Sequence, residues 1–129
     1  DCVISKDFDG LGTNKNLSSI KDDEIILDIG LKTVKKINDV LDKSNTVLWN
    51  GPAGYFENKS FLNGTLSIAC KISENTKNKS LISIVGGGDT ISAINKSKKK
   101  YNFTHLSTAG GAFLEFLEGK DLPGLNVLK

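Results

Sequence analysis

Three short segments of the sequence combine residue types that bind anions and metal ions. They are residues 50–57 (NGPAGYFE), 86–90 (GGGDT) and 109–112 (AGGA), and each follows a short run that predicts a strand. Glycine has no β-carbon, so a glycine turn lets backbone N–H groups approach an anion, and the helix that follows adds partial positive charge. One such turn can serve simply to reverse the chain tightly. We predict that the turns after residues 85 and 108 lie side by side, because right-handed crossovers between parallel strands place successive loops at the same end of a sheet. Two such turns side by side favour a polyphosphate ligand.

Asp89 is the carboxylate best placed to hold a metal ion beside such phosphates. It follows the glycines at 86–88 and opens a predicted helix. Mg²⁺ prefers one or two carboxylates together with phosphate oxygens, and an aspartate at a helix start can also cap that helix. The two roles are compatible, so Asp89 is a candidate metal ligand.

Other catalytic motifs fail on spacing. A dinucleotide fingerprint that starts at position 86 needs glycine or alanine at position 91, where the chain has Ile91, and no stretch matches G-x-x-x-x-G-K-[ST]. His105 and Ser107 suggest a base and a nucleophile, but the sequence gives the histidine no acid partner, so we expect a structural histidine. The two cysteines fit no metal spacing and are expected to be buried thiols.

The elements that must position these segments alternate between strands and helices. The predicted strands are residues 2–5, 24–29, 46–50, 81–85 and 104–107, and the predicted helices are residues 31–44, 65–75, 89–96 and 111–118. Strands with little polar alternation are typical of a parallel sheet. We therefore predict an α/β fold, a three-layer Rossmann-like domain whose parallel sheet is covered by helices on both faces. Residues 6–21 are expected to form a surface loop.

The composition bounds the domain organisation and the partners. The chain has 129 residues, of which 38% are hydrophobic and 25% charged, which suits one compact domain over residues 1–129. The net charge of +2 is spread along the chain, so we predict no nucleic-acid and no membrane partner, and we expect a cytoplasmic protein. All 17 basic residues are lysine, so chemistry that needs arginine has to come from elsewhere.

Four motifs together resemble the C-terminal, nucleotide-binding part of phosphoglycerate kinase. They are VLWNGPAGYFE at 47–57, F-x-x-G-T at 61–65, IVGGGDT at 84–90 and HLSTAGGAFLEFLEGKDLPG at 105–124. They occur in the order and with the spacing of the family, and residues 1–8 and 28–30 resemble it as well. The enzymes of the family are several times longer. We therefore expect residues 1–129 to be a single partial domain of such an enzyme.

The resemblance implies transfer of a phosphoryl group between 1,3-bisphosphoglycerate and ADP, which gives 3-phosphoglycerate and ATP in glycolysis and requires Mg²⁺. This is a phosphotransferase reaction with a carboxyl group as acceptor. By matching position, the resemblance assigns nucleotide-binding roles to Asn50, Gly51, Ala53, Phe56, Glu57, Gly87, Gly88, Asp89 and Thr90. Glu57 would hold the ribose and Asp89 the Mg²⁺. Gly88 and Gly111 would present helix-start amides to the phosphoryl group in transfer, a reaction that depends mainly on positioning and charge stabilisation.

Two residues depart from the family pattern. Ala109 replaces a glycine, which would strain the backbone if position 109 needs a positive φ, and Leu31 replaces a proline at a helix start. The family binds 3-phosphoglycerate through an N-terminal domain and a basic patch that contains arginine. This chain has neither, so we expect the isolated 129 residues to be inactive. The alternative is a free-standing α/β module that binds another phosphorylated ligand with the same glycine turns.

Overall fold

The strands form two separate sheets. The computed structural model describes residues 1–128, and in this part of the chain six strands pair in two sets of three. An antiparallel sheet with the order β2-β1-β3 is built from β1 (Cys2–Ser5), β2 (Thr13–Lys15) and β3 (Ile25–Ile29). A parallel sheet with the order β4-β5-β6 is built from β4 (Thr46–Asn50), β5 (Ile82–Gly86) and β6 (His105–Ser107).

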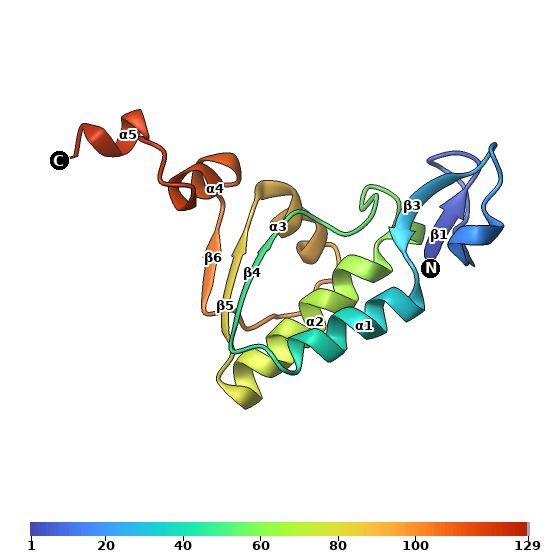
Figure 1. Cartoon of the computed structure of the whole chain (residues 1–129), viewed down its shortest axis with the longest axis horizontal. Coiled ribbons are helices and arrows are strands. Elements are labelled where there is room, and N and C mark those ends of the chain that lie inside the picture. Colours follow the sequence, from blue (N-terminus) through green and yellow to red (C-terminus); the bar gives the residue numbers. More distant parts are fainter. Residues whose placement is uncertain (129) are drawn as a thin grey trace.

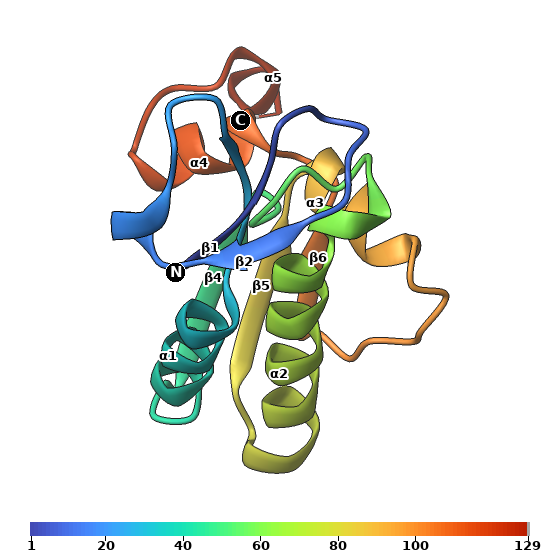
Figure 2. The same ribbon diagram turned by 90° about the vertical axis from the view of Figure 1, so that its right-hand side faces the viewer.

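Helices follow the strands at most of the expected places. They are α1 (Leu31–Leu41), α2 (Asn63–Lys79), α3 (Gly88–Asn95), α4 (Gly111–Leu117) and α5 (Pro123–Asn126), with 3-10 turns η1 (Leu17–Ser19) and η2 (Lys59–Phe61). Figure 2 shows α1 and α2 side by side in front of the parallel sheet. The sequence prediction gave the first four of these helices, whereas the short α5, which begins with a proline, was not predicted. The α/β fold with a parallel sheet flanked by helices is confirmed.

The main core lies between the parallel sheet and the helices α1 and α2. Leu41, Ile68, Ile72 and Leu81 form a buried cluster against which Trp49 packs. A neighbouring cluster of Ala69, Val85 and Ile94 joins α2, β5 and α3. The core thereby holds α3 against β5 and α2.

Helix α1 buries only some of its apolar residues. Val34 and Leu41 are buried, but Val40 is 64% exposed and Leu31 is 65% exposed. A helix repeats every 3.6 residues, so Leu41 returns to the face of Val34 after about two turns, whereas Val40 points elsewhere.

The first strands do not join the parallel sheet, in contrast to the prediction. β1 pairs antiparallel with both neighbours, with Cys2 opposite Lys15 of β2 and opposite Ile29 of β3. Strand β2 lies within the segment 6–21 that was expected to be a loop. Its sequence, Thr-Asn-Lys, is polar and mostly exposed. The strand is therefore formed by backbone pairing, and no hydrophobic pattern in the sequence predicts it.

The two faces of the parallel sheet are covered to different extents. The helices α1, α2 and α3 pack on the face that carries Trp49 and Val85. On the other face, Phe113 of α4 approaches Gly86, but Leu48 is 44% exposed and Ile82 is 50% exposed. Figure 1 shows α4 and α5 at the opposite end of the molecule from the N-terminal sheet.

Candidate functional site

The three segments singled out in the sequence meet at the carboxyl end of the parallel sheet. Asn50 of β4 pairs with Gly86 of β5, and Gly86 pairs with Ser107 of β6, so the three strands end at the same level. A β-carbon at Gly110 would lie 3.5 Å from the Cα of Gly87. The prediction that the two glycine turns lie side by side is confirmed.

Asn50 connects the end of β4 to both glycine turns. Its Nδ2 donates a hydrogen bond to the carbonyl oxygen of Gly110 at 3.4 Å. Its Oδ1 would lie 2.7 Å from a β-carbon at Gly87, which has a φ of +95°. Position 87 therefore requires glycine for two reasons: its φ is positive, and Asn50 leaves no room for a β-carbon.

Helix α3 begins at the centre of the site, and its first residues differ in exposure. Gly88 and Asp89 are exposed. Thr90 is fully buried, and its Oγ1 accepts a hydrogen bond of 2.8 Å from the backbone N–H of Gly51. Thr90 therefore joins the loop after β4 to the first turn of α3. Asp89 does not cap α3, because no side chain caps this helix.

The loop after β4 is held at several points along residues 51–57. The Ala53 N–H donates to Thr65 Oγ1 at 2.9 Å, and the Tyr55 N–H donates to the Leu27 carbonyl oxygen at 2.7 Å. Glu57 is exposed. Four of the residues to which the resemblance assigns nucleotide binding thus lie on a loop whose backbone is held by β3 and α2: Gly51, Ala53, Phe56 and Glu57.

A buried carboxylate packs against this loop at Gly54 and against the start of α2 at Gly64. Asp28 of β3 is 2% exposed and accepts hydrogen bonds of 2.8 Å from the backbone N–H groups of Gly64 and Ile29. A β-carbon at Gly54 or at Gly64 would collide with its carboxylate. Burial raises the pKa of Asp28, and the two hydrogen bonds partly oppose that shift. Sequence reasoning missed this role, which depends on contacts with residues 26 and 36 positions along the chain.

Lys96 is a second residue that sequence reasoning missed. It follows α3, and its Nζ donates hydrogen bonds to the carbonyl oxygens of Phe56 at 2.8 Å and Glu57 at 3.2 Å. The ammonium also lies 5.1 Å from the centroid of the Phe56 ring, within the range of a cation–π contact. Helix α3 therefore contacts the loop at its start, through Thr90, and just beyond its end, through Lys96.

The remaining candidates stay outside this arrangement. His105 is exposed on the edge strand β6, and among residues 1–128 no cluster of three histidine, cysteine, aspartate or glutamate side chains could hold a metal ion alone. Cys2 is buried as expected, whereas Cys70 is half-buried, with its Sγ 3.9 Å from the Tyr101 hydroxyl. A single exposed carboxylate at position 89 fits Mg²⁺ only when phosphate oxygens complete its coordination.

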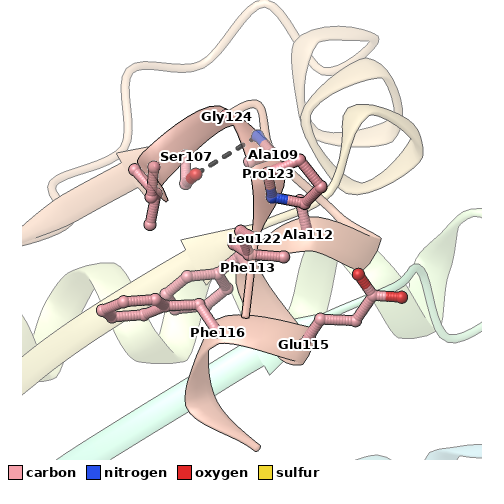
Figure 3. A pocket seen from close by; sticks show the side chains of 10 residues that line it. Ser107, Ala109, Ala112, Phe113, Glu115, Phe116, Leu122, Pro123 and Gly124 are labelled. Carbon is pink, nitrogen blue, oxygen red and sulfur yellow. Dashed lines mark hydrogen bonds between the residues drawn. The ribbon is translucent and has the colours of Figure 1, made fainter. Parts of the chain in front are cut away.

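A cavity of about 590 Å³ opens between α4 and α5, beside the third glycine turn. Figure 3 shows the ring of Phe113 and that of Phe116 on one side of it, and Leu122 and Pro123 also line it. This apolar lining is unsuited to phosphate, so the cavity is distinct from the arrangement around Asn50.

A model of the phosphoglycerate kinase family matches residues 1–120 of the chain. The chain belongs to this family. It is 41% identical to a phosphoglycerate kinase of Chelativorans sp., and the match covers 100% of this chain and 33% of that protein. It is 50% identical to that of Francisella philomiragia over 89% of the chain and 28% of that protein. The chain therefore spans about a third of the length of these relatives.

Solved structures of phosphoglycerate kinases share the fold. The structure from Coxiella burnetii is 38% identical, with a TM-score of 0.85 over 98% of this chain and 32% of that chain. The structure from Pyrococcus horikoshii is 33% identical, with a TM-score of 0.83 over 98% of this chain and 31% of that chain.

Both departures from the phosphoglycerate kinase pattern are accommodated. Residues 1–128 include two non-glycine residues with positive φ, Ser80 and Lys98, so Ala109 does not adopt the conformation that would strain it. Helix α1 still begins at Leu31, without the proline.

None of the helices among residues 1–128 is both long and apolar enough to span a membrane.

Proposed function

We propose that the chain is the C-terminal, nucleotide-binding part of a phosphoglycerate kinase that acts in glycolysis in the cytoplasm. The whole enzyme would transfer a phosphoryl group between 1,3-bisphosphoglycerate and ADP, giving 3-phosphoglycerate and ATP. The observation that carries the proposal is the meeting of two glycine turns and Asn50 beyond the carboxyl ends of the parallel strands. Ligands of open α/β sheets collect at this position.

The start of α3 would bind the nucleotide phosphates. Gly88 and Asp89 are exposed residues of the first turn of α3, and the N–H groups of a helix start together with the helix dipole attract an anion without any side-chain charge. The Asp89 carboxylate would hold Mg²⁺, and this ion, when bound, would neutralise charge on the phosphates. Gly88 and Gly111, both exposed at helix starts, would present N–H groups to the transferring phosphoryl group.

The loop after β4 would bind the nucleoside. Glu57 would accept hydrogen bonds from ribose hydroxyl groups. The remaining nucleotide-binding residues would be Asn50, Gly51, Ala53, Phe56, Gly87 and Thr90. In the observed bond the Thr90 Oγ1 accepts from the Gly51 N–H, so its own O–H would donate to a phosphate oxygen.

The three-carbon substrate would bind elsewhere in the enzyme. The 129 residues contain no arginine, and a lysine cannot form the bidentate hydrogen bonds that a guanidinium makes with a carboxylate or phosphate. We place 3-phosphoglycerate on an N-terminal domain of the family.

An amide NMR titration of the 129-residue chain with MgADP tests this site. We expect the largest shifts at residues 86–90 and 109–111, with smaller shifts along 51–57. Inorganic phosphate and a phosphorylated sugar serve as comparison ligands. A sugar phosphate that moved the same amides while MgADP did not would favour the α/β module for another ligand and overturn the nucleotide assignment.

A further inference from the structure

The loop after β4 is attached to α3 at both ends of the helix. At one end the Gly51 N–H bonds to Thr90 in the first turn of the helix, at 2.8 Å. At the other end Lys96, the residue just after α3, bonds to the carbonyl oxygens of Phe56 and Glu57. Helix α3 thus sets the separation between its own N-terminus and the Phe56–Glu57 pair.

Phe56 and Glu57 form the centre of a tight turn. The Asn58 N–H donates to the Tyr55 carbonyl oxygen at 3.3 Å, which closes the turn around the two residues. The carbonyl oxygens of Phe56 and Glu57 accept hydrogen bonds from the Lys96 ammonium. An ammonium has three donors, so one lysine can bind both carbonyls and still lie against the Phe56 ring.

The residues on either side of this turn have anchors that do not involve Lys96. Tyr55 donates to Leu27 of β3 at 2.7 Å. The Asn58 side chain donates to the carbonyl oxygens of Phe8 and Gly10 at 2.9 and 3.1 Å. Loss of the Lys96 ammonium would therefore free two residues, one of them Glu57, and leave the rest of the loop in place.

We propose that Lys96 is a positioning residue for ribose recognition, because it fixes the backbone that carries Glu57 relative to the phosphate-binding start of α3. The inference rests on the proposed function, in which Glu57 binds the ribose. Lys96 does not touch the nucleotide in this role. It sets the position of the Glu57 carboxylate, so its removal weakens the ribose contact and leaves the phosphate contacts unchanged.

The test compares ADP with 2′,3′-dideoxy-ADP, both with Mg²⁺, in NMR titrations of the 129-residue chain. The two ligands differ only in the ribose hydroxyl groups that Glu57 would bind. We expect the wild-type chain to prefer ADP by roughly three- to ten-fold, as the loss of one hydrogen bond of ordinary net strength to the exposed Glu57 predicts. In Lys96→Met the preference should fall close to one, with affinity for the dideoxy ligand within about two-fold of wild type.

Three further variants separate the explanations. Lys96→Arg keeps a donor for both carbonyls and should retain the preference. Lys59→Met removes a charge from the hollow that Lys59, Glu57 and Lys96 line together, and should also retain it. Glu57→Ala should lose the preference as Lys96→Met does.

The outcomes distinguish this inference from the proposed function. A wild-type chain that does not bind MgADP, or a Glu57→Ala variant that still prefers ADP, overturns the ribose assignment and the role of Lys96 with it. If the wild-type chain and Lys96→Met prefer ADP to the same extent, the inference alone is wrong. If Lys59→Met also lost the preference for ADP, the effect of Lys96 would be explained by its positive charge near Glu57, and the positioning role would be wrong.

Discussion

Asp89 is the residue at which the proposed metal chemistry can be removed with little structural change. It is exposed and does not cap α3, so Asp89→Ala should leave the thermal melting temperature nearly unchanged. The variant should lose the Mg²⁺-dependent rise in melting temperature that MgADP produces. Asp22→Ala, an exposed aspartate in a distant loop, is the control and should keep that rise. An undiminished rise in Asp89→Ala would remove Asp89 from the site.

Gly87 and Gly88 are adjacent, yet their substitution by alanine should have opposite effects on stability. Gly87 has a φ of +95° and no room for a β-carbon beside Asn50, so Gly87→Ala should lower the free energy of unfolding by about 1–3 kcal/mol. Gly88 has open space around it and begins a helix. Gly88→Ala should therefore raise the free energy of unfolding, by up to about 1 kcal/mol. Urea unfolding of both variants measures the difference, and equal effects would contradict the described turn.

Asp28 should make stability depend on pH in the direction opposite to most carboxylates. Burial raises its pKa above the ordinary 3.8, so the native state binds its proton more tightly than the unfolded chain does. Its contribution is fully present below pH 3.8 and is lost as the pH rises through the folded-state pKa. The free energy of unfolding of wild type relative to Asp28→Asn should therefore decrease as the pH is raised from 3.8. Urea titrations at several pH values measure it.

Asp42 is the control for this measurement, because its contribution to stability should change with pH in the opposite direction. Hydrogen bonds from Lys71 and then Lys79 hold the pKa of Asp42 far below its ordinary value. Its contribution is therefore present at neutral pH and is lost as the pH falls below 3.8. Wild type relative to Asp42→Asn should gain stability as the pH rises through this acidic range. The same slope for both pairs of proteins would mean that Asp28 is not buried as described.

At the scale of elements, local patterns predicted the parallel sheet better than the antiparallel one. The starts of α1 and α4 were predicted to the residue, because glycine precedes or opens each helix and an apolar pattern follows. Strand β2 was missed because its three polar residues carry no pattern, and its pairing with β1 depends on the backbone of another segment. Sheet membership of β1 and β3 was wrong for the same reason, since apolar runs do not specify their partners.

The site shows the same division between local and distant information. The meeting of the glycine turns was predicted, because parallel topology brings strand ends together. The supporting contacts of Asp28 and Lys96 were not, because each joins residues far apart in the sequence. A buried carboxylate and a surface lysine have no sequence signature that distinguishes them from ordinary strand and helix residues.

Strand β4 should promote self-association of the chain. It lies at one edge of the parallel sheet, and Leu48 on it is 44% exposed next to the half-exposed Ile82 of β5. An exposed apolar edge strand is a template for pairing with another chain. Static light scattering should show a mass that rises with concentration, and Leu48→Lys should reduce that rise. Val40→Lys, which changes an even more exposed apolar residue on α1, away from the sheet edge, is the control and should not.

For the molecule as a whole, we predict that the isolated 129-residue chain does not turn over 3-phosphoglycerate and ATP. Holding two reactants in line can lower a barrier by roughly 7–11 kcal/mol, and these residues contain no arginine with which to grip the acceptor. Nucleotide contacts from one loop and one helix start should give a dissociation constant near or above about 1 mM, equivalent to about 4 kcal/mol of binding. A coupled kinase assay and calorimetry with MgADP measure the two quantities. Turnover by the purified chain would refute the assignment of the acceptor to another domain, and micromolar binding would show that a complete nucleotide pocket is already present in these residues.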